Sequence, residues 1–121
     1  MDKFQAAFEI LYLLSAVDGE VDINEVEIIK NFLQSNYGSI SFDPSEVIGS
    51  IDTLTPQGML EEFKTAASVF KGSSGAQDRT AFLDFAVRLI VADGNISEEE
   101  GQMFRFLADS WNVNIARFLA K

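Results

Sequence analysis

One stretch of this sequence occurs twice, and the repeat constrains the fold more than any other feature. Asp18-Gly19-Glu20-Val21-Asp22 near the N-terminus is matched by Asp93-Gly94-Asn95-Ile96-Ser97 near the C-terminus. Three residues beyond each stretch stands a glutamate, Glu25 in the first copy and Glu100 in the second. A register shared across two such segments indicates an internal duplication. We therefore expect two related helix–turn–helix halves arranged about a pseudo-twofold axis.

Each copy has the residues of a turn between two helices. The glycine after the aspartate suits the left-handed conformation at a helix C-terminus. Asp22 with Glu25, and Ser97 with Glu100, have the spacing of a capping box at the start of the next helix. The repeat therefore predicts where one helix ends and the next begins.

Apolar residues recur at three- and four-residue spacing along the rest of the chain, which predicts helices throughout. Pro44 and Pro56 stand where helices begin, behind Asp43 and Thr55, and Ser74-Gly75-Ala76-Gln77 has the residues of a helix cap. We expect an all-α bundle of about seven helices forming a single domain over residues 1–121, with a short last helix from about Asn114. The first helix and the one from Gln77 to about Ala92 are the most apolar, so we expect them to pack together in the centre.

The composition excludes several kinds of site. The 121 residues include no cysteine and no histidine. Disulfides, thiolate metal sites and serine–histidine triads are therefore impossible within this sequence. Any metal would be a hard cation bound by oxygen, calcium or magnesium above all.

The charge is strongly negative, with 9 basic and 19 acidic residues and a formal net charge of −10. Such a surface repels phosphate backbones, so nucleic acid is not expected as a direct partner. It favours basic proteins and divalent cations instead. A plain alternative is that the acidity only keeps the chain soluble.

The Asp-Gly corners resemble the second half of an EF-hand loop, but their first halves do not. Leu14 and Leu89 stand where such a loop needs its first oxygen ligand. Helix capping explains most of the repeated positions without a metal. It does not explain Asp18 and Asp93, because a negative charge is unfavourable at a helix C-terminus. A divalent cation at these corners and a purely structural role both remain open.

Two further carboxylates occupy equivalent positions inside the leading helix of each copy. Asp84 has Arg88 four residues on, which predicts an ordinary helical ion pair. Glu9 lies on a thin polar stripe with Gln5 and Tyr12, and we expect it to face solvent. The alternative is a central cation site shared by Glu9 and Asp84.

No segment has the pattern of a secretion signal or a membrane span. Asp2 and Glu9 interrupt the N-terminal segment, and the longest nearly apolar run, from Ile10 to Val17, is too short to cross a bilayer. We expect a cytoplasmic protein with no membrane insertion, for which peripheral association would need a partner protein.

The residues from Ser15 to Val21 and from Val91 to Glu100 resemble the TerB-like family, named for tellurite-resistance proteins. The resemblance implies a pseudo-symmetric helical bundle and a role in stress response with partner proteins, at the inner face of the membrane. It implies that a metal would face Asp18, Glu25, Asp93 and Glu100, with Glu9 and Asp84 as further candidates. In the second copy Asn95 and Ser97 replace two acids of the first, which argues against two equal sites.

Three interpretations follow, in this order of preference. The first is a non-enzymatic binding module in stress or metal resistance, with weak calcium or magnesium binding at the two corners and with protein partners. The second is a structural interaction scaffold without metal. The third is a magnesium-dependent hydrolase that uses clustered carboxylates.

Overall fold

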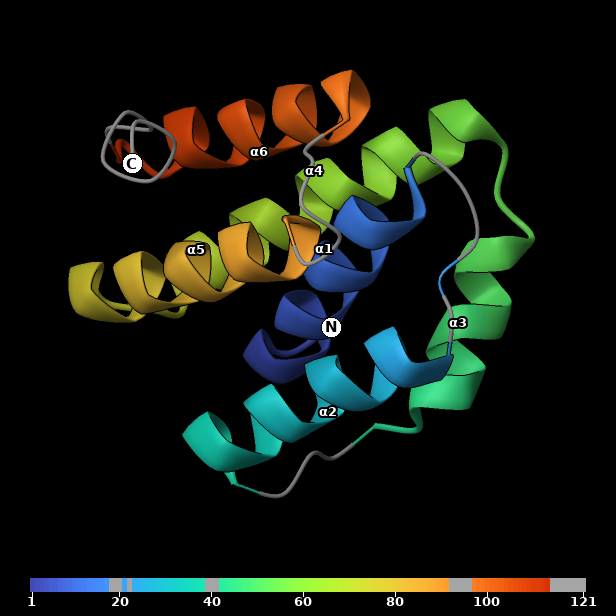
Figure 1. Cartoon of the computed structure of the whole chain (residues 1–121), viewed down its shortest axis with the longest axis horizontal. Helices are drawn as coiled ribbons and strands as arrows, with labels where there is room; N and C mark the ends of the chain where they lie inside the picture. Colours follow the sequence, from blue (N-terminus) through green and yellow to red (C-terminus); the bar gives the residue numbers. More distant parts are fainter. Residues whose placement is uncertain (18–20, 22, 39–41, 92–96, 114–121) are drawn as a thin grey trace.

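The computed structural model describes residues 1–17, 21, 23–38, 42–91 and 97–113. This part of the chain contains six α-helices and no strand, which confirms the all-α prediction (Figure 1). The predicted last helix, from about Asn114, lies outside the described residues. The helices are α1 (Lys3–Ala16), α2 (Ile23–Tyr37), α3 (Pro44–Asp52), α4 (Pro56–Gly72), α5 (Ala76–Ile90) and α6 (Glu98–Ser110).

Most helix starts follow from local sequence. The side chains of Asp43 and Thr55, each directly before a proline, accept hydrogen bonds from backbone N–H groups in the first turns of α3 and α4. Ser97 and Glu100 form the predicted capping box at α6. The predicted cap of α5 is wrong in detail, because Gly75 is the N-cap and the Ser74 hydroxyl donates instead to the Phe70 carbonyl at the end of α4.

Helix α1 lies at the centre of the bundle and contacts each of the five other described helices (Figure 1). It does touch α5, as the sequence predicted, but its most extensive contact is with α4. Both α1 and α4 carry a pair of adjacent buried alanines, Ala6 with Ala7 and Ala66 with Ala67. Small side chains allow helix axes to approach closely, which favours this pairing.

Aromatic side chains connect the C-terminal helices of the core. The indole of Trp111 stacks on Phe70 with ring centroids 5.0 Å apart, and it meets Phe82 edge-on at 5.6 Å. Its Nε1 donates to the Ala67 carbonyl over 3.0 Å. Trp111 is therefore part of the core, where it joins α4, α5 and the end of α6.

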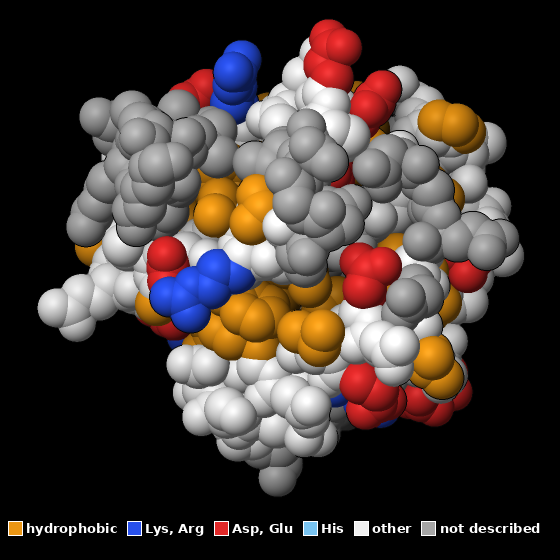
Figure 2. All heavy atoms as spheres, in the orientation of Figure 1, with side chains coloured by type: hydrophobic (Ala, Val, Ile, Leu, Met, Phe, Trp, Pro, Cys, Tyr) orange, Lys and Arg blue, Asp and Glu red, His pale blue; other side chains and the backbone are white. Residues whose placement is uncertain are grey.

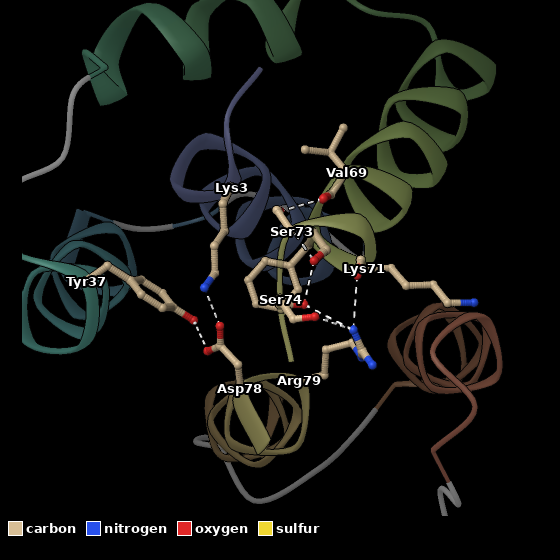
Figure 3. Close-up of polar contacts among 9 residues, drawn as sticks. Lys3, Tyr37, Val69, Lys71, Ser73, Ser74, Asp78 and Arg79 are labelled. Atoms are coloured by element: carbon tan, nitrogen blue, oxygen red, sulfur yellow. Dashed lines mark hydrogen bonds and ion pairs between the residues drawn. The ribbon is translucent and has the colours of Figure 1, made fainter. Parts of the chain in front are cut away.

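The N-terminal turn of α5 is tied to three other helices by polar contacts (Figure 3). Asp78 forms an ion pair with Lys3 of α1 and accepts a hydrogen bond of 2.9 Å from the hydroxyl of Tyr37 on α2. Arg79 donates to the carbonyl of Lys71 in the last turn of α4 and to that of Ser74 just after the helix. These contacts hold the start of α5 against α1, α2 and the end of α4.

None of the six described helices is both long enough and apolar enough to cross a membrane.

Candidate functional site: an acidic pocket beside the central helix

The polar stripe of α1 does not face solvent. Glu9 is only 2 % exposed and Tyr12 is 6 % exposed, while Gln5 is half-buried. The expectation of a solvated Glu9 is therefore wrong. Glu9 is buried because α3 and α4 both pack against α1, and residues of both helices surround the space in front of it.

The carboxyl group of Glu9 is only half satisfied by hydrogen bonds. Its Oε2 accepts a hydrogen bond of 2.9 Å from the side-chain amide of Gln5, one turn earlier on α1. Its Oε1 is buried and has no hydrogen-bond partner within the described part of the chain. Buried polar atoms are almost always paired, because an unpaired one costs about 1–3 kcal/mol. Because Glu9 also lines a pocket, a donor that reached this carboxyl group from the pocket would relieve that cost.

The environment of Glu9 favours its neutral form. Burial, and after it the hydrogen bond and the negative charge of the neighbouring Glu62, raise the pKa of Glu9 from 4.5 to about 7. The Gln5 amide acts in the opposite direction. Glu9 thus changes its charge near neutral pH, and a positive group placed beside it would shift it to the carboxylate.

Glu9 opens onto a pocket of about 510 Å³ between α1, α3 and α4, which we call the Glu9 pocket. One part of its wall is polar and the other is apolar, and none of the described residues in the wall is basic. The polar part consists of Gln5, Glu9, Asp43, Glu46, Ser50 and Glu62, and the apolar part of Phe42, Val47, Ile51 and Leu54.

The side chains around the pocket rest on well-defined elements. Glu9 projects from the central helix, and Glu62 lies beside it from α4. Asp43 accepts a hydrogen bond of 2.9 Å from the backbone N–H of Ser45, so it caps α3 and is held at the pocket edge. Phe42 packs on Phe8 of the core, with ring centroids 5.4 Å apart. The pocket therefore offers four carboxyl groups and one aromatic ring on a fixed frame.

Of the four predicted ligands at the Asp-Gly corners, the described residues include the two glutamates. Asp18 and Asp93 lie outside the described residues. Glu25 stands in the first turn of α2. Glu100 is 7 % exposed, and one of its oxygens accepts a hydrogen bond of 3.1 Å from the Ser97 N–H in the capping box. In the described ranges, no three acidic side chains are arranged so that they could hold a metal ion.

Asp84 behaves as an ordinary helical carboxylate. It forms the predicted ion pair with Arg88, with 2.6 Å between Oδ2 and Nη2. It does not line the Glu9 pocket, so the described structure does not bring Glu9 and Asp84 together at one site.

Sequence reasoning missed Glu62 and Glu46. A signal for Glu62 was present: it lies three residues after Met59 and four before Ala66, on the edge of the inward face of α4. An acid at that position is unusual and marks a possible buried site. Glu46 offered no such signal, because an acid in the first turn of a helix is explained by the helix dipole.

Acidic side chains are spread over the face of the molecule drawn in Figure 2, and basic side chains are few there. This distribution agrees with the net charge of −10. The Glu9 pocket therefore belongs to a molecule whose overall electrostatic field attracts positive groups.

The comparison with protein families gives one match over nearly the whole chain. The model of the family described as tellurite resistance protein TerB matches residues 4–121. Neither the comparison with curated proteins nor the comparison with solved structures gives a match. Both copies of the Asp-Gly repeat, and all six described helices apart from the first residue of α1, fall within the matched range. This chain therefore belongs to the TerB family.

Proposed function

We propose that this protein is a non-catalytic binding module that recruits a positively charged protein partner through the Glu9 pocket. The observation that carries the proposal is the buried Glu9, whose Oε1 has no partner among the described residues and which faces three further acids. The family name supports a setting in stress or metal resistance.

Electrostatics favours this kind of partner over others. The pocket wall contains Glu9, Asp43, Glu46 and Glu62 and no basic residue within the described part. Glu9 and Glu62 repel each other when both are charged, and a positive group between them would convert that repulsion into attraction. The surrounding negative field would also raise the rate of encounter with a basic surface.

A titration with defined peptides tests the proposal. A short lysine- and arginine-containing peptide is added to the isotopically labelled protein, and backbone amide shifts are followed at Gln5, Glu46, Ser50 and Glu62. We expect saturable shifts at these residues and none with an acidic peptide of the same length.

Matched variants separate the pocket from the general charge. Glu9→Gln combined with Glu62→Gln removes two ionisable carboxyl groups from the pocket, and Glu98→Gln combined with Glu99→Gln removes two from α6. We expect the pocket variant to bind at least about tenfold more weakly, a loss of roughly 1.4 kcal/mol. Equal weakening in both variants would mean that only net charge matters, and the proposal would be wrong.

A second candidate function is divalent-cation binding. Mg²⁺ is commonly held by one or two carboxylates together with several water molecules, and the Glu9–Glu62 pair meets that need. The corner residues Asp18, Glu25, Asp93 and Glu100 remain proposed ligands of a weak calcium or magnesium site.

Adding calcium and then magnesium to the chelator-stripped protein decides between these sites. Shifts confined to residues 18–25 and 93–100, and lost in Asp18→Asn or Asp93→Asn, would place the cation at the corners. Shifts at residues 5–9 and 62, lost in Glu9→Gln, would place it in the pocket. No shifts at millimolar ion would favour a scaffold without metal.

A further inference from the structure

The Glu9 pocket has the volume and lining of a site for a long amphipathic side chain. Its volume of about 510 Å³ exceeds what a single hydrated ion needs, since a water molecule takes up about 30 Å³ in the liquid. Its wall is divided between carboxyl groups and the apolar side chains of Phe42, Val47, Ile51 and Leu54. A ligand that matches both parts needs an aliphatic stem and a positively charged end.

The positively charged end of such a ligand has to donate hydrogen bonds to more than one carboxyl group. Glu9 Oε1 accepts no hydrogen bond from the described residues, and the carboxyl group of Glu62 lies next to that of Glu9. A guanidinium group has five N–H donors in a planar fork and can serve two carboxylates at once. A lysine ammonium is a compact and strongly hydrated charge, and it loses more hydration on entering a half-apolar pocket.

The aromatic ring in the wall favours the same group. Phe42 is half-buried, lines the pocket and is supported from behind by Phe8. Guanidinium planes stack on aromatic faces more readily than ammonium groups do. Phe42 thus offers a surface for the flat group that the carboxylates would orient.

We propose that the Glu9 pocket is an arginine-specific site, in which one arginine side chain of a partner protein places its guanidinium between Glu9 and Glu62 and against Phe42. This inference rests on the proposed function, because it names the side chain by which the positively charged partner is held. Charge complementarity with the pocket, and the buried unpaired oxygen of Glu9, select this occupant.

Three pentapeptides that differ only at the central residue test the inference. The central residue is arginine, lysine or citrulline in a glycine–serine background with blocked ends, and binding to the full chain is followed by the amide shifts of Gln5, Glu46, Ser50 and Glu62. Citrulline keeps the shape of arginine but carries no charge. We expect the arginine peptide to bind at least about threefold more tightly than the lysine peptide, and the citrulline peptide to give no saturable shifts.

A variant of the aromatic wall gives an independent readout. Phe42→Leu keeps every carboxyl group and removes the ring. We expect this substitution to weaken the arginine peptide and to leave the lysine peptide nearly unchanged, so that the preference for arginine falls. Glu9→Gln should weaken both peptides, and its folding is checked by the amide spectrum before binding is measured.

The outcomes separate this inference from the proposed function. Equal binding of the arginine and lysine peptides would overturn arginine specificity and leave recruitment of a positive partner intact. A preference for arginine that is unchanged in Phe42→Leu would overturn the role of the ring. If neither the arginine and lysine pentapeptides nor the peptide that contains both residues shifts the pocket residues, both the inference and the proposed function are wrong.

Discussion

Glu9 of α1 and Glu62 of α4 place two carboxyl groups next to each other in one pocket, and no basic side chain in the described part of the wall neutralises them. Burial, and after it the hydrogen bond and repulsion from Glu62, raise the pKa of Glu9 to about 7, so Glu9 changes its charge near neutral pH. The pocket wall therefore contains two neighbouring acidic groups without a positive counter-charge among the described residues. The protonation of Glu9 affects the stability of the fold, and a positive group in the pocket would favour its charged form.

Glu9→Gln should stabilise the protein at alkaline pH. The pKa of Glu9 in the folded protein, about 7, is above its ordinary value of 4.5, so the folded state binds this proton more tightly than the unfolded state does. Its contribution is therefore fully present below pH 4.5 and is lost as the pH rises through about 7. Glutamine imitates the neutral form at every pH. We expect the variant to exceed the wild type by about 1–3 kcal/mol at alkaline pH and to match it under acidic conditions.

Urea unfolding across this pH range measures the difference. Glu61→Gln is the matched control, because Glu61 is exposed on α4 beside Glu62 in the sequence and does not line the pocket. A constant difference between Glu9→Gln and the wild type at all pH values would contradict the assignment of a raised pKa to Glu9.

Ser97→Ala should destabilise α6 by about 1 kcal/mol. The substitution removes the hydroxyl that accepts a hydrogen bond of 3.1 Å from the Glu100 N–H, and it leaves one end of the capping box empty. Thermal or urea unfolding checks the loss. Ser68→Ala, at an exposed position inside α4, should be neutral or slightly stabilising, because alanine is the better helix former. Equal effects of the two substitutions would mean that the capping box contributes nothing.

Asp78→Asn should loosen the start of α5 and change the titration of Tyr37. Burial raises the pKa of Tyr37 above its ordinary value of 10, and its hydrogen bond to Asp78 and the charge of Asp78 raise it further. Without the negative charge, the pKa of Tyr37 should fall towards 10, and stability should fall by about 1 kcal/mol as the ion pair with Lys3 is lost.

The phenolate absorbance during an alkaline titration reports this change, and Tyr12 serves as an internal reference. Burial and Asp52 raise the pKa of Tyr12 to about 12, and that value should not move in Asp78→Asn. Asp109→Asn, at an exposed position on α6, should leave both tyrosines unchanged. A Tyr37 titration that is the same in Asp78→Asn and in the wild type would contradict the contact.

Trp111→Phe should cost about 1–3 kcal/mol. The indole is 3 % exposed, stacks on Phe70 and donates to the Ala67 carbonyl, and phenylalanine keeps only part of the packing. Because the sequence has one tryptophan, its fluorescence reports this position alone: emission should be blue-shifted in the folded protein and shift to the red on unfolding. Phe106→Leu, at a more exposed position on α6, should cost less. Emission typical of a solvated indole in the folded state would argue against the buried position.

Local sequence was sufficient for most of the secondary structure. The starts of three helices were predicted from their capping residues, Asp43, Thr55 and the Ser97–Glu100 pair. A helix N-terminus needs acceptors for its free N–H groups wherever it lies in the fold. Gly38 directly follows the last residue of α2, and its φ of 79° puts the backbone in the left-handed region that glycine favours. The ion pair between Asp84 and Arg88 followed in the same way, since residues four apart on a helix are neighbours.

The position of Glu9 could not be predicted in this way. The sequence determined that Gln5, Glu9 and Tyr12 share one face of α1, because the helical repeat places them there. Only the tertiary structure decided that α3 and α4 cover this face, that Glu62 comes to lie beside Glu9, and that a pocket remains between them. The physical reason is that helix periodicity depends on neighbours along the chain, whereas burial and pKa depend on which distant helices pack against that face.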